Sequence, residues 1–150
     1  MASRVPRYRS RIATILFDLL NPIPYGFFVG TLAFDIIYAA SANVFWTKCA
    51  AWLVSIGLVI AIVPRLINLG HVWLPSPHGA TRAEKLDFWL GSLGIVAAIV
   101  NAFVHSRDAY AVVPQSIILS VTTVVLLGCG QIALGLDKFG KPGTTEDRHE

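Results

Sequence analysis

Four long apolar segments, separated by short polar ones, dominate the sequence. They cover about residues 22–42, 45–69, 83–105 and 112–136. Each has about the 20 residues that a helix needs to cross the hydrocarbon core of a bilayer. Their apolar residues form continuous runs, whereas a soluble amphipathic helix would show them at helical period. The pattern predicts an all-α membrane protein whose four transmembrane helices form two hairpins and pack as a four-helix bundle.

The first 20 residues have a different pattern. Four arginines open this segment, and its apolar residues then recur at i, i+3, i+4 and i+7: Ile12, Ile15, Leu16 and Leu19. Such a pattern is typical of a basic amphipathic helix that lies in the membrane interface. We therefore expect residues 1–20 to form a cytoplasmic amphipathic arm, residues 21–140 the transmembrane domain, and residues 141–150 a disordered cytoplasmic tail.

Local signals support these boundaries. Pro22 and Pro24 interrupt the surface helix before the first span, because proline lacks an N–H and disfavours helix in the preceding residue. Thr81 and Glu84 have the spacing of a capping box at the start of the third span. A signal peptide is the rival interpretation of the N-terminal part, but the apolar stretch is too long for one and Asp35 interrupts it.

Composition and charge agree with a membrane protein. The chain is 55% hydrophobic and only 14% charged, whereas about a quarter of the residues in a soluble domain are charged. Its net charge is +3, but the basic residues flank the apolar spans, so we expect no nucleic-acid partner. Four Lys or Arg lie before the first span, three at or beside the connection between the second and third, and three after the fourth, against only Lys48 and Arg107 elsewhere. The positive-inside rule then places both termini in the cytoplasm.

A buried polar cluster is expected near the outer face. Asp35 lies in the outer half of the first span, near the expected depth of Asn101, and His105 follows Asn101 by one helical turn. One interpretation is a proton relay or an outward-opening ligand site. The other, which we favour, is a carboxylate that its neighbours satisfy and that holds the two hairpins in register, because a relay needs several such groups in series.

A second polar group is expected at the cytoplasmic side: Arg65, Asn68, His71, His78 and Gln131. It could contact an anionic lipid, a quinone headgroup or haem b, or it could be a solvated positive loop, which we favour. A transmembrane haem b takes two facing histidines, yet His71 and His105 are expected at opposite ends of the bundle. We expect no cofactor, with haem b or quinone as the alternative.

Motifs for catalysis or metal binding are missing from the sequence. It has no GxSxG, Walker, HExxH or GxGxxG motif in the required context, and its two cysteines lack the spacing of a metal site. We therefore expect no catalytic residues and no metal. Four glycines in the third and fourth spans would allow close helix packing: Gly91, Gly94, Gly128 and Gly130.

The chain resembles a small bacterial inner-membrane family known as domain of unknown function 2231. The resemblance rests on Asn21-Pro22, on the apolar run that ends in Phe34-Asp35-Ile36-Ile37, and on the third span up to Asn101 and Arg107. It extends from about Asn21 to Gly140. The family's leading histidine is Asn21 here, and its second motif histidine, expected near Tyr25-Gly26, is absent. The resemblance implies four spans in a bacterial inner membrane and no established activity, although such proteins are thought to accompany redox enzymes outside the membrane.

These observations predict an accessory or anchoring subunit of a larger membrane complex, without catalytic activity of its own, whose partners are the lipid bilayer and other membrane subunits. The alternative is an electron-transfer subunit that binds haem b or quinone for a membrane-associated dehydrogenase or respiratory complex. A small transporter or proton channel through Asp35 is a third hypothesis.

Overall fold

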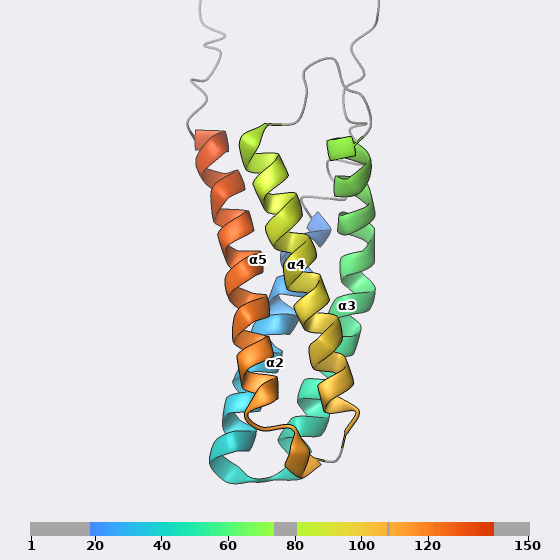
Figure 1. Ribbon diagram of the computed structural model, residues 1–150, viewed down its shortest axis with the longest axis vertical. Helices are drawn as coiled ribbons and strands as arrows, with labels where there is room; N and C mark the ends of the chain where they lie inside the picture. The colour runs from blue at the N-terminus through green and yellow to red at the C-terminus, as the bar shows by residue number, and fades with distance from the viewer. Residues whose placement is uncertain (1–18, 74–80, 108, 140–150) are drawn as a thin grey trace, which may run out of the picture.

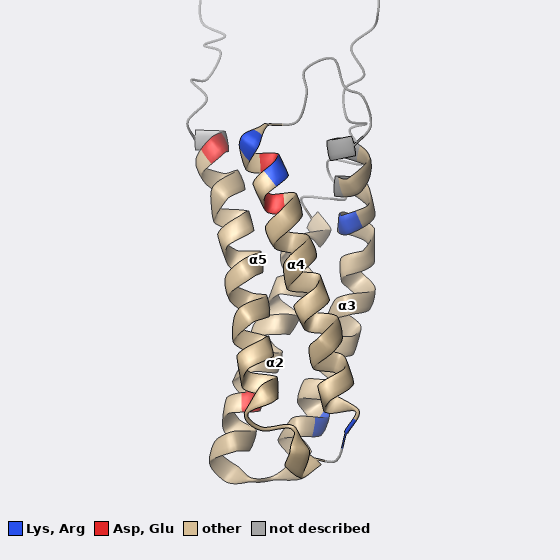
Figure 2. Cartoon of the chain, in the orientation of Figure 1, with Lys and Arg blue, Asp and Glu red and all other residues tan. Residues whose placement is uncertain are grey.

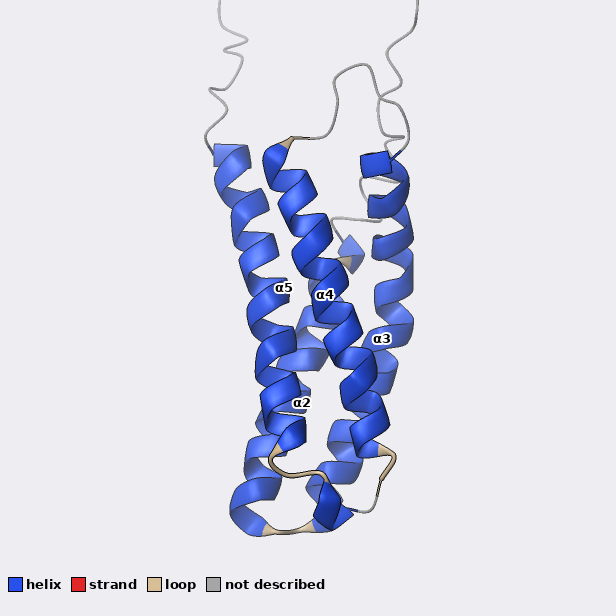
Figure 3. Ribbon diagram, viewed as in Figure 1, coloured by secondary structure: helices blue, strands red, loops and turns tan. Residues whose placement is uncertain are grey.

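The computed structural model describes residues 19–73, 81–107 and 109–139. The expected arm and tail fall mainly or wholly outside this part of the chain. Within it, four α-helices and one short 3₁₀ helix follow in the order α2 (Pro22–Ser41), α3 (Val44–Trp73), α4 (Arg82–His105), η1 (Ala109–Ala111) and α5 (Gln115–Phe139). The labels are those of Figure 1. The described residues include no strand (Figure 3).

All four α-helices contain a stretch long and apolar enough to cross a membrane. The predicted fold class, an all-α membrane protein with four spans, is confirmed. The fourth helix begins at Gln115, slightly later than expected. Pro114 immediately precedes it and disfavours helix at Val113, so the connection from α4 is longer than the sequence indicated. Pro64 lies inside α3, which nevertheless continues to Trp73.

The helices form two antiparallel hairpins that pack side by side. α2 packs against α3 and α5, and α4 packs against α5 and α3, so the four helices form a ring. The described residues of both hairpin connections, 42–43 and 106–107 with 109–114, lie at one end of the bundle, which we call the hairpin end (Figure 1). The open end is the opposite one, where α3 and α5 end and α4 begins. α2 starts well short of the open end (Figure 1).

The start of α4 is a capping box, as the sequence predicted. The backbone N–H of Glu84 donates to Thr81 Oγ1 at 3.2 Å, and the backbone N–H of Thr81 donates to Glu84 Oε2 at 2.7 Å. These bonds satisfy two amides that a helix start would otherwise leave without a partner. They help to define where α4 begins.

The inward faces of the helices carry polar residues among apolar ones. On α2, the positions facing the core are spaced three and four apart: Phe28, Thr31, Asp35 and Tyr38. Large apolar side chains such as Trp52, Trp89 and Phe103 lie on the outside, where the bilayer would surround them. Lipid gives no hydrophobic drive for helices to associate, so close packing and polar contacts must hold this bundle together.

The four glycines named above lie at contacts between helices, and the nearest atom to each belongs to a side chain of another helix. A Cβ on Gly91 would collide with the guanidinium of Arg65. The other three pairs are Gly94 with Leu127, Gly128 with Tyr25, and Gly130 with Asp87. These glycines therefore make room for particular side chains, two of which are charged.

Candidate functional site

The structure brings Asp35, Asn101 and His105 together around a fourth side chain, Ser120. His105 Nε2 lies 2.8 Å from Asp35 Oδ1, and Ser120 donates its hydroxyl hydrogen to Asp35 Oδ2 at 2.6 Å. Asn101 Nδ2 in turn donates to Ser120 Oγ at 2.8 Å. The side chain of Asp35 is 0% exposed and that of His105 only 1%. This network, hereafter the Asp35 network, connects α2, α4 and α5 inside the bundle.

Hydrogen-bond geometry decides how many protons the Asp35–His105 pair holds. His105 Nδ1 lies 2.9 Å from the backbone carbonyl oxygen of Asn101. A carbonyl only accepts, so Nδ1 carries a hydrogen. One further proton then joins Nε2 to Asp35 Oδ1, either as imidazolium with carboxylate or as imidazole with carboxylic acid. Both forms have zero net charge, which lowers the cost of placing a carboxylate inside a membrane span.

Ser, His and Asp are also the residues of a hydrolase triad, but here they are connected differently. In a triad the histidine accepts the serine proton and the aspartate supports the histidine from the other side. Ser120 instead donates directly to Asp35, and both ring nitrogens of His105 are bonded elsewhere. The arrangement does not activate a serine nucleophile.

The Asp35 network continues toward both the hairpin end and the core. Tyr38, one turn after Asp35, donates its hydroxyl to the backbone carbonyl of Ala109 at 2.8 Å and so ties η1 to α2. Toward the core, Asn101 Oδ1 and Thr123 Oγ1 are buried and have no partner among the described residues. Beyond them lies a layer of apolar residues formed by Phe28, Val54, Ala98 and Leu127.

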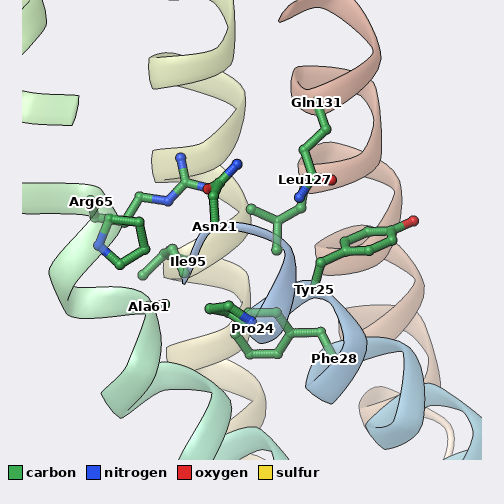
Figure 4. Close-up of a pocket in the computed structure, with 10 residues that line it drawn as sticks. Asn21, Pro24, Tyr25, Phe28, Ala61, Arg65, Ile95, Leu127 and Gln131 are labelled. Carbon is green, nitrogen blue, oxygen red and sulfur yellow. The ribbon is translucent and has the colours of Figure 1, made fainter. Parts of the chain in front are cut away.

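A second polar cluster lies on the other side of this layer, toward the open end. Figure 4 shows Arg65 from α3, Tyr25 from α2 and Gln131 from α5 around a small cavity of about 10 Å³, next to Asn21. Arg65 interacts electrostatically with Asp87, which is 2% exposed. Figure 2 shows that charged residues concentrate toward the two ends of the bundle and are absent from the drawn middle.

The structure thus brings Arg65 and Gln131, two members of the expected cytoplasmic group, to one cavity. Asn68 and His71 belong to α3, but their side chains lie outside the described part of the structure. His78 falls in residues 74–80, which are also outside it. Among the described residues, no group of three His, Cys, Asp or Glu could hold a metal ion.

Reasoning from sequence missed Ser120, Thr123 and Asp87. A signal for the first two was present: Ser116, Ser120 and Thr123 recur at i, i+4 and i+7 in an otherwise apolar span, so they share one helix face. Asp87 is a carboxylate close to the start of the third span, four residues before Gly91. Its partner on α3 could not be read from helical spacing.

Four apolar spans with a polar core define a small integral membrane protein of the all-α class. A family model described as a predicted membrane protein, domain of unknown function 2231, matches residues 18–138. The chain belongs to that family, and the resemblance noted in the sequence is confirmed. No curated protein and no solved structure matches the chain.

Proposed function

We propose that this protein is an accessory or anchoring subunit of a larger membrane complex and performs no chemistry of its own. One observation carries the proposal: the protein's own groups satisfy the carboxylate, the imidazole and the serine hydroxyl at the most polar site in the bundle. Both ring nitrogens of His105, both carboxylate oxygens of Asp35 and the hydroxyl of Ser120 are bonded to one another or to backbone. Such a network stabilises one packing of α2, α4 and α5 and offers a substrate no free reactive atom.

The apolar residues next to the Asp35 network favour an accessory role over a proton channel. A channel needs a continuous series of polar groups or water across the membrane. Phe28, Val54, Ala98 and Leu127 form an apolar layer between the Asp35 network and the Arg65 cluster. The polar groups therefore occur in two separate clusters, and each joins neighbouring helices.

Haem b receives no support from His105, the one histidine whose side chain the structure describes. Ligation of iron takes a free ring nitrogen, and His105 would have to give up its bond to Asp35 or to the Asn101 carbonyl. Either loss leaves a buried polar group without a partner.

A pull-down tests the proposal. The tagged protein would be purified from its native membrane in a gentle detergent, beside an unrelated four-span protein at the same expression level. We expect one set of larger membrane proteins to co-purify in constant ratio with this chain alone. Recovery of the chain as a monodisperse protein without partners would contradict a subunit role. An absorption spectrum of the same sample tests haem, since a Soret band would contradict the proposal that no haem is bound.

We also propose a bacterial inner membrane with the open end in the cytoplasm. Arg82 and Lys85 lie in the first turn of α4, and Arg65 lies in the last third of α3, toward the open end. Lys48 lies near the start of α3 and Arg107 just after α4, at the hairpin end. With the native cysteines replaced, Lys48→Cys should react with an impermeant maleimide added to intact cells, whereas Lys85→Cys should react only after lysis. The reverse pattern would invert the topology.

A further inference from the structure

A groove between α3 and α4, near the open end, has the features of a ligand site. Its volume is about 300 Å³, at the lower end of the range for small-molecule pockets. Nine residues line it, seven of them apolar: Leu58, Ala61, Ile62, Arg65, Leu66, Leu69, Phe88, Ser92 and Ile95. We call it the α3–α4 groove. None of these residues belongs to the Asp35 network.

The α3–α4 groove opens to the surface that lipid surrounds. Ile62 and Leu66, on one wall, are 55% and 62% exposed. They lie on α3, near the end of its membrane-spanning stretch, Val44–Ile67. A molecule reaching the groove from the side would therefore come from the bilayer, and it must itself be largely apolar.

Arg65 is the polar group that this groove offers. It is half-buried and lines both the groove and the small inner cavity. The other polar residue, Ser92, already donates its hydroxyl hydrogen to the Phe88 carbonyl at 2.7 Å. A guanidinium has five N–H donors and no acceptor. The groove therefore suits a ligand with a hydrogen-bond acceptor.

Charge balance selects between acceptors. The charge of Arg65 is already opposed by that of the buried Asp87. A phosphate or carboxylate headgroup bound at Arg65 would leave one negative charge in excess at this depth, which costs free energy within a span. A neutral carbonyl adds no charge and can still accept a hydrogen bond from the guanidinium.

We propose that the α3–α4 groove binds a neutral, apolar carbonyl compound of the quinone class, with the ring against the groove's aliphatic walls and one carbonyl accepting a hydrogen bond from Arg65. The proposal concerns binding only and is independent of the accessory role proposed above. Gly91 contributes indirectly, because any side chain there would displace the guanidinium.

Thermal stability tests the proposal, because a ligand that binds only the folded protein raises its melting temperature with ligand concentration. The full-length protein would be placed in phosphatidylcholine nanodiscs and titrated with decylubiquinone. We expect a saturable rise in the temperature at which half the protein stays folded. The variant Ile62→Trp, which fills the groove, should lose this rise. Val59→Trp on the same helix should retain it, because Val59 is 66% exposed and does not line the groove.

A second variant and two further probes test the chemistry of the headgroup. The double variant Arg65→Gln/Asp87→Asn removes both charges together and should weaken quinone binding at least tenfold. Decylbenzene, which has a ring and the tail but no oxygen acceptor, should give no saturable rise, and nor should phosphatidylglycerol added to the nanodiscs.

Several results would overturn the proposal. They are a flat quinone titration, an equal rise in Ile62→Trp, an unchanged affinity in the double variant, or an equal effect of decylbenzene. A saturable rise with phosphatidylglycerol that Ile62→Trp abolishes would identify an anionic lipid as the occupant. Failure of the pull-down would leave this titration unaffected, so the two proposals fail separately.

Discussion

Replacing Asp35 by asparagine or by leucine separates a structural role of the Asp35 network from a role that needs its charge. Asparagine keeps the shape and the bonds: its Nδ2 can donate to His105 Nε2, and its Oδ1 can accept from Ser120. Leucine has a comparable size but no polar atom, so Ser120 loses its acceptor and His105 Nε2 loses its partner. Both groups stay buried in the core.

The structure sets the expected magnitudes. Leucine removes two side-chain hydrogen bonds, and such bonds in a membrane protein contribute about 0.6 kcal/mol on average and up to about 1.7 kcal/mol. The Asp35→Leu variant should therefore be less stable by about 1 to 3 kcal/mol. The Asp35→Asn variant should lose less than about 0.6 kcal/mol, the average for one bond.

Reversible unfolding of the purified protein in mixed micelles of dodecyl maltoside and SDS measures these free energies. The substitution Ile36→Leu is the matched control, because Ile36 is the next residue on α2 and faces outward. In the Asp35→Leu background, Ser120→Ala should add only the cost of the bond from Asn101, since Ser120 has already lost its own acceptor. If Asp35→Asn destabilised the protein as much as Asp35→Leu, the bundle would need the ionised carboxylate itself, and the proposal that hydrogen bonds alone account for the role of Asp35 would be wrong.

Three further predictions concern packing, capping and the hairpin end. Gly91→Ala should lower the free energy of unfolding by about 1 kcal/mol, the low end of the cost of overpacking, because the new methyl meets the flexible end of Arg65, which can shift. Gly26→Ala should not lower it, since no atom lies within 4 Å of the added Cβ; equal effects would contradict this. Thr81→Ala should cost about 1 kcal/mol through loss of the capping box, and Thr81→Ser should restore it. Tyr38→Phe removes the bond to the η1 carbonyl and should cost about 1 kcal/mol, with faster hydrogen exchange in residues 109–112; unchanged exchange would show that other contacts hold η1.

The Asp35 network and the Arg65 cluster have different proposed roles. The Asp35 network is closed, since its strongest donors and acceptors bond to one another. Arg65 lines a groove that is open to the side, and a guanidinium carries five N–H donors. A structural core and a lipid-facing binding groove can therefore coexist in a chain this small, because they occupy opposite sides of the Phe28 layer.

The amino-acid sequence by itself determined the class of this protein. Long apolar runs leave few alternatives to membrane helices, because only hydrogen-bonded helices or closed barrels satisfy the backbone in lipid. The capping box at Thr81 was equally local, since four consecutive residues contain it. The proximity of Asp35, Asn101 and His105 could be anticipated because expected depth in the membrane and helical period restrict where inward polar residues can meet.

Only the tertiary structure decided which atoms those residues bond to. Depth gives the level of a side chain but not the rotation of its helix. For that reason Ser120 could not be placed on Asp35, nor Asp87 beside Arg65, before the helices were packed. The α3–α4 groove likewise depends on how closely two neighbouring helices approach along their length. How closely α3 and α4 approach depends on the contacts of side chains from several helices together. No single segment of the chain contains all of these residues.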